Sequence, residues 1–534
     1  MKKFIIVFLL LSFLYYSCRN RSASEAHIVG DYVKIPLKAD LSRLTEKQKH
    51  LIELLIRITD YIDSIYFYEN FGNPYPVLDT ITDSLKRELF LINFGPWNMI
   101  TMQAFIKGFG KKPLGGNFYP YDITMQEFLK SADADKSSHY TFIRRDSSNN
   151  LYSIPYHVML KKYTDTICSL LIEASKYTEN ERFREYLNQI AIDLKADNYY
   201  KSDSLWVLIR NNLIDFVVGP LYIATDKLMD LKADHIAMVL IKDTIWTQKV
   251  QKYNVWLKYL QKALPVPPEY KEEKPGDASS ITVYDAIAMG GSAKVSGTLM
   301  SIVLPSLDQR VSLNVGMKNI QFKNVIEYKS KYIVKPLAKE ILPKENLQYI
   351  TSNAFFVNTI MWEIGNSLGL KNTINGKGTV REALKETATI IEYVKNNLMS
   401  LYLVNRLAQV DEIQNDLKEN YYTFVVDLIR ALRFGKLNNY SKANLITLNY
   451  FFKTKAIKIG WDNKIRIQID KFKTITDSLI RKIIVMQGNG DYKQAKSFIK
   501  QYNYIPPELY NLLQKVNSKH IPVDIYPVNI KLKP

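Results

Sequence analysis

Apolar residues recur at helical spacing through most of this chain, and this periodicity is the strongest constraint on its fold. In TEKQKHLIELLIRITDYIDSI, residues 45–65, one helix face carries Leu51, Leu54, Leu55, Ile58, Ile62 and Ile65. Thr45 and Gln48 have the spacing of a capping box, which predicts the start of this helix. Such a stripe must be buried, and 534 residues with 47% apolar content suffice for a large core.

A segment of different composition divides the helical pattern. Helical stretches are expected through roughly 158–262, and the Pro-rich LPVPPEYKEEKPGDASS, residues 264–280, ends them. Short β-type runs cut by Gly and Ser follow, so we expect a small sheet or barrel there. From about Leu347 the helical pattern returns, and it ends in the loop-like IPVDIYPVNIKLKP. The predicted fold is α+β, predominantly α-helical and two-lobed.

The first residues have the pattern of an export signal. Lys2 and Lys3 precede an apolar run over 4–14, which is too short for a good transmembrane helix. The following Ser17 and Cys18 resemble the cleavage and lipidation site of a bacterial lipoprotein. Tyr15 stands where that pattern prefers Leu, so plain secretion and a buried N-terminal helix stay as alternatives.

This interpretation sets the expected location and the domain organisation. We expect a lipid anchor at Cys18 in a bacterial cell envelope, on the periplasmic face because no acidic run follows Cys18. Only Cys168 then remains, so an intrachain disulfide is excluded. The expected parts are a signal peptide (1–17), a tether (18–40), and a two-lobed unit that is mainly helical (41–263), then β-rich (264–346), then helical (347–534).

The charge of the chain bears on its partners. Lys plus Arg exceed Asp plus Glu by 72 to 53, and the excess is spread along the chain, as in EYKSKYIVKPLAK and KTKAIKIGWDNKIRIQIDKFK. A nucleic-acid-binding arm concentrates its charge in long clusters, so we expect no nucleic-acid partner. The excess favours a general attraction to acidic surfaces or anionic lipid headgroups.

Nine segments in a fixed order resemble the dipeptidyl-peptidase III family of zinc metallopeptidases, in its short bacterial form. They are DNYYKSDSLW, DFVVGPLYIATDKLMDLKA, LPVPPEY, VYDAIAMGG, LPSLDQRV, NTIMWEIGNSLGL, GKGTVREALKE, LRFGKLNNYSKAN and QGNGDY. The resemblance covers about Phe118 to Ile525. It implies a two-lobed fold with a wide cleft, zinc on helices of the mainly helical lobe, and a small β-barrel along which peptides lie.

The residues at the implied zinc site differ from the family pattern. In the short bacterial relatives the zinc helix resembles H-E-x-x-H, which places two imidazoles one turn apart with a glutamate beside them. Here Trp362 stands at the first His, Glu363 at the glutamate and Asn366 at the second His. An indole has no lone pair for a metal, and a single amide oxygen is a poor zinc ligand.

The third implied ligand is the second glutamate of a run resembling E-E-x-K-A-D. Aligning on Lys395 places Glu392 at the first glutamate and Tyr393 at the second, and Thr379 with Glu382 forms a capping box expected to start that helix. A phenol is neutral at pH 7 and donates poorly to zinc. If the alignment slips by one residue, Glu392 stays as a single carboxylate, which does not hold a catalytic zinc.

The histidines give a check that needs no alignment. No two lie within five residues of each other, so H-E-x-x-H cannot be written anywhere; they are His27, His50, His139, His157, His235 and His520. A site built from His157, His235 and a carboxylate stays open as an alternative. We expect no cofactor, and the family's zinc in particular is predicted to be absent.

Two further family positions are also changed. The family has E-T-Y after Gly-Pro-Ile, to hold the peptide's amino terminus and the scissile carbonyl, and Tyr222 and Ala224 stand at the Glu and Tyr. The family's A-H-G histidine, implied to stabilise transition-state charge, is Tyr440. We expect Trp362, Tyr393 and Tyr440 to pack together in the vacated volume, with Tyr222 joining them if the cleft closes.

Other enzyme signatures are weak. Gly290 and Gly291 lack the spacing of a phosphate-binding loop, and no Gly-x-Ser-x-Gly is present. Cys168 lies on an apolar helical face and is expected in the core.

The leading hypothesis is an inactive peptidase homologue that binds a peptide or protein in its cleft. The expected ligand-binding residues are Tyr222, Ala224, Gly290, Gly291 and Tyr440, with the region from Gly290 to Val303 offering a strand edge. One alternative is a scaffold lipoprotein with an inert cleft. Another is an active hydrolase with a rebuilt site that includes Glu363.

Overall fold

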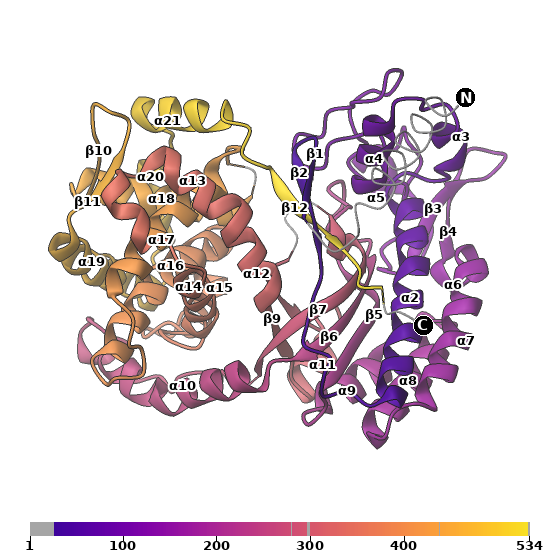
Figure 1. Ribbon diagram of the computed structural model, residues 1–534, viewed down its shortest axis with the longest axis horizontal. Coiled ribbons are helices and arrows are strands. Elements are labelled where there is room, and N and C mark those ends of the chain that lie inside the picture. The colour runs from indigo at the N-terminus through magenta and orange to yellow at the C-terminus, as the bar shows by residue number, and fades with distance from the viewer. Residues whose placement is uncertain (1–25, 279, 296–298, 437, 532–534) are drawn as a thin grey trace, which may run out of the picture.

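The chain folds into two lobes joined by a few segments (Figure 1). This computed structural model describes residues 26–278, 280–295, 299–436 and 438–531. The predicted signal peptide over 1–17 and the lipidation site Cys18 therefore lie outside the described residues. The family-like fold class is confirmed: the structure is mixed α+β and predominantly helical.

The first lobe holds the central sheet and the N-terminal helices. Its helices are α2 (Glu46–Asn70), α3 (Tyr75–Leu78), α4 (Ser84–Ile92), α5 (Met125–Lys130), α6 (Tyr156–Met159), α7 (Lys161–Ser175), α8 (Glu181–Asp193), α9 (Tyr200–Leu208) and α11 (Gln309–Asn314). Its strands are β1 (His27–Val29), β2 (Tyr32–Pro36), β3 (Thr141–Arg145), β4 (Leu151–Pro155), β5 (Ile214–Tyr222), β6 (Asp234–Lys242), β7 (Ile281–Gly291), β8 (Ser301–Leu304), β9 (Lys318–Phe322) and β12 (Asp524–Val528).

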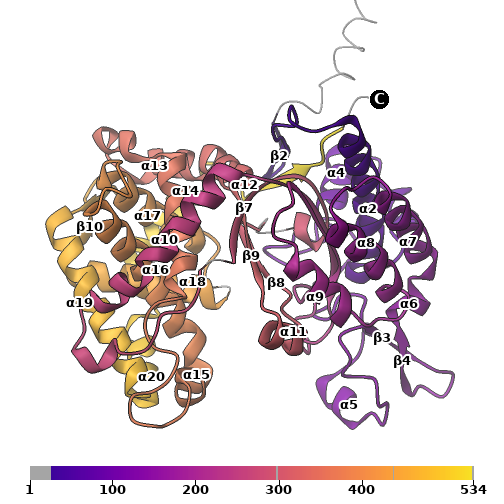
Figure 2. The same cartoon turned by 90° about the horizontal axis from the view of Figure 1, so that it is seen from below.

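The second lobe is almost entirely helical. Its elements are α13 (Lys335–Ile341), α14 (Ser352–Gly365), α15 (Val380–Leu384), α16 (Ala388–Ala408), α17 (Leu417–Leu432), α18 (Asn439–Lys453), β10 (Ile457–Ile459), β11 (Ile465–Ile467), α19 (Ile469–Gly488), α20 (Tyr492–Tyr502) and α21 (Pro507–Asn517). Figure 2 shows α10 (Thr244–Lys262) lying across the second lobe and α12 (Lys323–Lys329) where the two lobes meet.

The central sheet has five strands in the order β5-β6-β7-β9-β8. β7 and β9 are parallel, and the other neighbouring pairs are antiparallel. The sheet is open, so of the two predicted forms it is a sheet and not a closed barrel. Its two edges nevertheless approach each other, because the Ser306 hydroxyl, just beyond β8, donates to the carbonyl of Leu221 on β5 at 3.2 Å.

The helical interpretation of 158–262 is wrong at β5 and β6. Both strands are buried along almost their whole length, and their continuous apolar runs do not alternate. A short apolar run of this kind cannot be told from a buried helix by periodicity alone. The sheet therefore begins within the predicted helical region 41–263 and is completed by strands of the region 264–346.

The chain ends form a second small sheet with the order β1-β2-β12. β12 runs parallel to β2, so the loop predicted for the C-terminal residues is wrong there. The predicted tether is also wrong from residue 26 onward, because Val33, Ile35 and Leu37 are buried in the main core. Pro527 is tolerated because β12 lies at the edge of its sheet.

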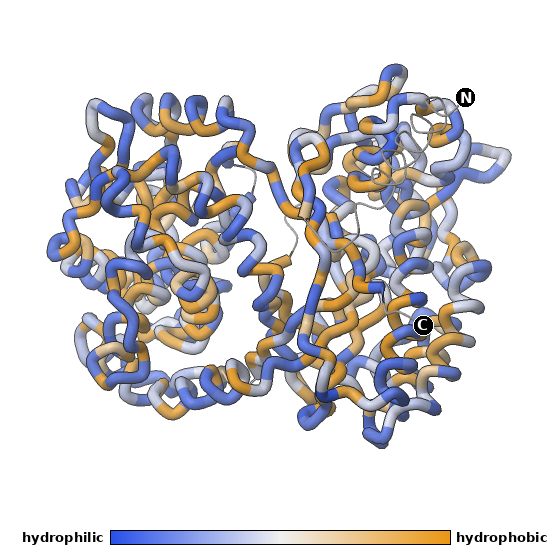
Figure 3. The backbone as a smooth tube through the Cα atoms, viewed as in Figure 1, coloured by the Kyte–Doolittle hydropathy of each residue, from blue (hydrophilic) through white to orange (hydrophobic). Residues whose placement is uncertain are grey.

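Helix α2 is the element on which the first lobe is built. The capping box of Thr45 and Gln48 is present as predicted, and the apolar stripe from Leu51 to Ile65 is buried. Figure 3 shows that hydrophobic residues concentrate where α2 meets the sheet and between the helices of the second lobe. Cys168 on α7 is buried as predicted, and burial raises the pKa of its thiol to about 11.

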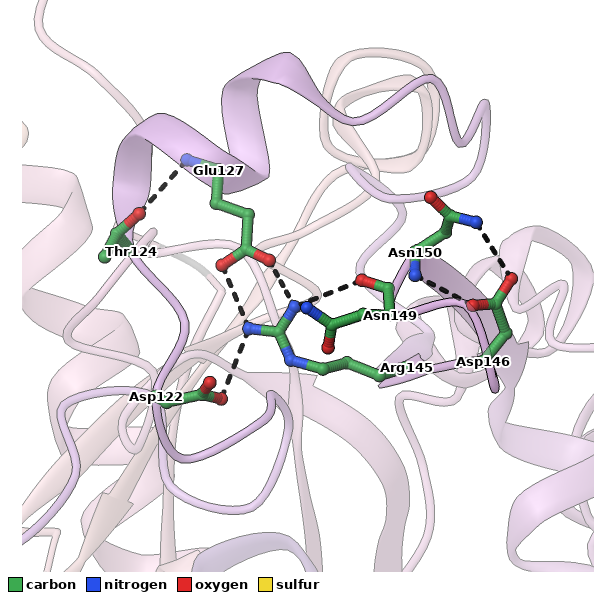
Figure 4. Close-up of polar contacts among 7 residues, drawn as sticks. All are labelled: Asp122, Thr124, Glu127, Arg145, Asp146, Asn149 and Asn150. Atoms are coloured by element: carbon green, nitrogen blue, oxygen red, sulfur yellow. Dashed lines mark hydrogen bonds and ion pairs between the residues drawn. The ribbon is translucent and has the colours of Figure 1, made fainter.

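The β3–β4 hairpin is linked to α5 by an ionic cluster at the surface (Figure 4). Nη2 of Arg145 lies 3.0 Å from Oε2 of Glu127 and 3.2 Å from Oδ1 of Asp122. The Thr124 hydroxyl caps α5 by accepting from the Glu127 amide at 3.2 Å. Exposed ion pairs contribute little to stability. The cluster therefore serves to hold α5 beside the β3–β4 hairpin more than to stabilise the lobe.

Among the described residues no helix is both long enough and apolar enough to cross a membrane.

Changing Gly291 to Ala is expected to destabilise the first lobe. Gly291 has φ +67°, and an added Cβ would lie 2.1 Å from the carbonyl oxygen of His235 on the paired strand. We expect the free energy of unfolding to fall by about 3 kcal/mol, measured by thermal unfolding followed by circular dichroism. Gly110→Ala is the control, because its Cβ would meet only the Tyr121 hydroxyl at 3.8 Å. Equal losses in the two variants would contradict the packing argument.

Candidate functional site

Three aromatic rings from three helices lie together in the second lobe. Trp362 on α14 lies 5.5 Å from the ring of Tyr393 on α16 and 6.2 Å from the ring of Tyr440 on α18, measured between centroids. Tyr393 and Tyr440 are 6.5 Å apart. Two of the three pairs meet edge to face and the third is tilted, arrangements that aromatic rings favour. The predicted packing of Trp362, Tyr393 and Tyr440 is therefore confirmed, and we call these residues the aromatic trio.

Two buried asparagines next to the aromatic trio fix the orientation of the Trp362 indole. Nε1 of Trp362 donates to Oδ1 of Asn397 at 2.9 Å, and Nδ2 of Asn397 donates in turn to Oδ1 of Asn444 at 2.8 Å. Asn397 and Asn444 are buried between α16 and α18. The indole N–H is thus satisfied by a fixed amide oxygen, which holds the ring in one orientation.

Tyr440, the third ring of the aromatic trio, lies beside an ion pair on α17. Its hydroxyl is 3.5 Å from Oδ2 of Asp427, and the other oxygen of Asp427 accepts from Nε of Arg430 at 2.6 Å. Burial and the nearby Asp427 raise the pKa of the Tyr440 phenol well above its ordinary value. The phenol is therefore neutral at pH 7.

Glu363, the next residue after Trp362, turns toward the other lobe. Its side chain is buried, with 7% of the residue exposed. Oε1 accepts from the Ser301 hydroxyl on β8 at 2.7 Å, and Oε2 accepts from Nδ2 of Asn319 on β9 at 3.0 Å. Burial raises the pKa of Glu363, and the hydrogen bonds from Ser301 and Asn319 oppose that shift. A carboxylate of the second lobe thus accepts hydrogen bonds from two strands of the first lobe.

Tyr222 and Ala224, which are predicted to bind one end of a peptide, lie at the end of β5. Tyr222 is 38% exposed, and partial burial followed by the nearby Tyr393 raises the pKa of its phenol. The amide of Ala224 donates to Oδ2 of the buried Asp234 at 2.7 Å. The structure therefore brings Tyr222 near the aromatic trio, although no ring contact joins them among the described residues.

Gly290 and Gly291 lie inside the sheet and not at its edge. They pair with Ala237 and Ile236 on β6, and a Cβ added at Gly290 would lie 2.6 Å from the carbonyl oxygen of Thr59 on α2. Close approach of two backbones explains both glycines. Their contact with a ligand stays a prediction, and the open edge within residues 290–303 belongs to β8.

Comparison with known proteins agrees with this geometry. A solved structure of DPP III from Caldithrix abyssi has a TM-score of 0.88 and 29% identity, over 94% of this chain and 98% of that one. Dipeptidyl-peptidase III from Corallococcus sp. strain EGB has a TM-score of 0.77 and 27% identity, over 93% and 95% of the two chains. The chain is dipeptidyl-peptidase III-like. A curated relative, Nudix hydrolase 3 from Arabidopsis thaliana, is 26% identical over 95% of this chain and 74% of its own length. No family model matches the chain.

The donors present do not fit the zinc that a dipeptidyl-peptidase III-like fold implies. The indole of Trp362 has no lone pair, and Oδ1 of Asn366 already accepts from Nδ2 of Asn396. Burial and the neighbouring Glu363 raise the pKa of Tyr393, which keeps its phenol protonated. Among described residues, no group of three or more His, Cys, Asp or Glu is arranged to hold a metal ion.

The alternative ligand Glu392 is already engaged. Its Oε1 pairs with Lys395 at 2.7 Å, and its Oε2 accepts from Nε2 of Gln487 at 2.8 Å. The capping box of Thr379 and Glu382 is present, but the helix that it starts ends at Leu384. The interpretation that this box begins the helix of Glu392 is therefore wrong, because Lys385 with φ +53° separates α15 from α16.

The two candidate histidines each pair with a carboxylate of their own. Nδ1 of His157 lies 2.8 Å from Asp197, and Nδ1 of His235 lies 2.5 Å from Glu69. His235 and Glu69 are fully buried between β6 and α2, whereas His157 is partly exposed. Each contact is a local pairing within the first lobe.

Sequence reasoning missed Ser301, Asn319 and Asn397. Ser301 and Asn319 are short polar residues within β-type runs, and nothing in the sequence places them opposite Glu363. Asn397 offers a weak signal, since it and Asn396 are adjacent amides directly before the largely apolar run LMSLYLV of α16. A buried amide in such a position needs partners, which points to a polar contact between helices.

Replacing Glu363 with Gln is expected to change how stability depends on pH. The folded-state pKa of Glu363 is raised above 4.5, so the folded state holds this proton more tightly than the unfolded state. The contribution of Glu363 to the free energy of unfolding therefore falls as pH rises through 4.5 toward the raised value. Relative to wild type, Glu363→Gln should gain stability with rising pH, measured as midpoints of thermal unfolding from about pH 4 to pH 8.

Glu508→Gln, at an exposed carboxylate on α21, provides the control for this experiment. Its unfolding midpoints should follow the wild-type pH dependence. If Glu363→Gln also runs parallel to wild type across the whole range, Glu363 is not a buried carboxylate.

Proposed function

We propose that this dipeptidyl-peptidase III-like protein binds an extended peptide without hydrolysing it. The observation that carries the proposal is the use already made of the residues at the implied zinc site. Trp362, Tyr393 and Tyr440 pack on one another, and Glu363 is hydrogen-bonded to Ser301 and Asn319. These contacts give the residues structural roles in the fold.

Hydrolysis by Glu363 alone is chemically unfavourable. A metal lowers the pKa of its bound water from 15.7 to about 7, which generates a nucleophile at neutral pH. Without a metal, the carboxylate of Glu363 would have to take a proton from water whose pKa is still about 15.7. Glu363 is buried, its pKa is raised, and both of its carboxylate oxygens already accept hydrogen bonds. It is therefore also poorly placed to activate a water molecule.

The edge of β8 supports the binding part of the proposal. Strand β8 is the last strand of the sheet, and the amide of Phe322 donates to the carbonyl of Met300 at 3.0 Å. Since bonded pairs alternate in an antiparallel ladder, Ile302 bonds to β9 while the backbone groups of Ser301 and Val303 point outward. An extended peptide can pair with these outward groups by strand addition.

The position of the ligand's ends is also part of the proposal. Tyr222 and Ala224, at the end of β5, would lie beside one end of the peptide, and Tyr440 with the aromatic trio would supply apolar contact. The family holds an amino terminus at this place with a carboxylate. Replacing that carboxylate by Tyr222 favours a hydrogen bond or ring contact over an ion pair.

We further propose that the protein is carried at the cell envelope by a lipid on Cys18. The support is the sequence of the first residues, with Lys2 and Lys3 before a short apolar run and Ser17 before the cysteine. Neither peptide binding nor inactivity depends on this anchor.

The purified protein is expected to hold less than stoichiometric zinc after dialysis against zinc, and to release no dipeptide from dipeptidyl substrates. The physical reason is the donor set of indole, carboxamide and phenol. Metal analysis by mass spectrometry and a chromogenic dipeptidyl assay measure the two quantities. Stoichiometric zinc, or turnover that Glu363→Ala abolishes, would instead establish a hydrolase with a rebuilt site.

Binding of a defined pool of short synthetic peptides should be weakened in Val303→Pro. Proline removes the outward amide of Val303 and leaves the bonds between β8 and β9 in place. Loss of one such bond with the steric effect of the ring should weaken binding at least about tenfold, measured by fluorescence anisotropy. Val303→Ala is the matched control and should bind as wild type does.

A second variant separates peptide binding from a scaffold role. Ala224→Trp adds a large ring just beyond the end of β5, whereas Ser518→Trp adds the same side chain at an exposed position. Peptide binding lost only in Ala224→Trp supports the proposal. If neither Val303→Pro nor Ala224→Trp alters binding, or no peptide binds, the edge of β8 is not the binding site and a scaffold role is favoured.

A further inference from the structure

The β10–β11 hairpin carries a fully exposed tryptophan at its tip. Ile457, Ile465 and Ile467 are buried on the inner side of the hairpin, which seats it on the second lobe. Trp461 in the turn is 97% exposed. An indole this exposed contributes nothing to the core, so a role outside the fold is the simplest explanation.

The hairpin is held rigidly, which makes Trp461 a fixed projection. Nζ of Lys464 donates to the carbonyls of Lys339 and Glu340 at 2.8 and 2.9 Å, where α13 ends. Arg466 pairs with Asp462 across the turn at 2.7 Å. The tip is thus braced from both sides and presents its ring in a defined place.

Basic residues surround this projection. Residues 453–473 contain two acidic residues, Asp462 and Asp470, against seven basic ones, Lys453, Lys455, Lys458, Lys464, Arg466, Lys471 and Lys473. Lys458 lies directly opposite Arg466 in the hairpin register. Like charges in that position repel each other, and only Arg466 is neutralised by Asp462.

Cations on neighbouring helices extend the basic surface. Within the described part of the chain, Lys455 and Lys458 form no ion pair. The pKa of Lys464 is lowered by burial and then by Lys515 on α21, which places a further cation beside the hairpin. Lys335 and Lys339 are exposed on α13, while Glu340 lies near Lys464 and Glu345 near Arg466. The surface therefore has a clear positive excess.

The position of the hairpin is consistent with a membrane near the chain's N-terminal end. Figure 1 shows the hairpin, α21 and β1 along the upper edge of the molecule, and α10 along the lower edge. The described chain begins just before β1, eight residues after Cys18. The hairpin and the first described strand therefore lie on the same side of the molecule.

We propose that the β10–β11 hairpin docks on an anionic lipid bilayer. Trp461 enters the headgroup region, where an amphipathic indole is favoured, and Lys455 and Lys458 face the lipid phosphates. A single projecting ring offers little area for a protein interface, which needs a broad complementary surface. A tip that inserts while cations surround it suits a bilayer surface instead.

The test uses the chain from residue 18 with Cys18→Ser, so that no lipid is attached and peptide binding plays no part. Cosedimentation is measured with vesicles of phosphatidylcholine alone and of equal parts phosphatidylcholine and phosphatidylglycerol. We expect binding to the anionic vesicles only, falling as salt is raised. Lys455→Gln/Lys458→Gln should weaken binding about twentyfold, and Trp461→Ala should weaken it several-fold.

Matched controls lie elsewhere on the molecule. Lys252→Gln/Lys258→Gln removes the same charge from exposed positions of α10, and Leu313→Ala removes an apolar side chain that is 82% exposed on α11. Both should bind nearly as wild type does. The proposal is overturned if anionic vesicles are not bound. It is equally overturned if the α10 variant loses as much binding as the hairpin variant, since charge alone would then explain the attraction.

Discussion

The buried carboxylate of Glu363 is the contact on which the arrangement of the site depends. Among described residues it forms no ion pair, and its closest hydrogen bonds come from the Ser301 hydroxyl and the Asn319 amide, with a longer one from Asn366 at 3.5 Å. A buried ionised group without a cation is unfavourable, and removing either donor would leave it worse. The contact of Glu363 with Ser301 and Asn319 therefore sets how the two lobes meet at this point. It also determines which face of β8 and β9 packs against α14.

The aromatic trio follows from the same geometry. Trp362 lies one residue before Glu363 on α14, so the orientation that turns Glu363 to the sheet turns Trp362 toward α16 and α18. Its ring contacts Tyr393 and Tyr440, and its N–H is taken by Asn397. The indole N–H is therefore already hydrogen-bonded, and the Tyr440 hydroxyl lies 3.5 Å from Asp427. The aromatic trio thus contributes mainly apolar ring surface to this part of the second lobe.

The sequence was informative where the signal is local and weaker where it depends on distant partners. The helix over 46–70 was predictable from its capping box and stripe, and the association of Trp362, Tyr393 and Tyr440 was predictable from their aligned positions. The sequence predicts helix where β5 and β6 lie, because a strand buried on both faces has no alternation. The partners of Glu363 could not be found at all, since Ser301 and Asn319 reach it only through the packing of the two lobes.

The small sheet formed by β1, β2 and β12 has a consequence for how the molecule is made. The ribosome makes strand β2 long before its partner β12, because residues 37–523 lie between the two strands. Beyond β12, the amide of Ile530 donates to the carbonyl of Ile287 on β7 at 3.0 Å, so the segment after β12 also lies against the central sheet. The first lobe cannot be completed until β12 has been synthesised. A chain with this topology therefore keeps one lobe incomplete, with the edge of β2 unpaired on that side, while the whole second lobe is being translated.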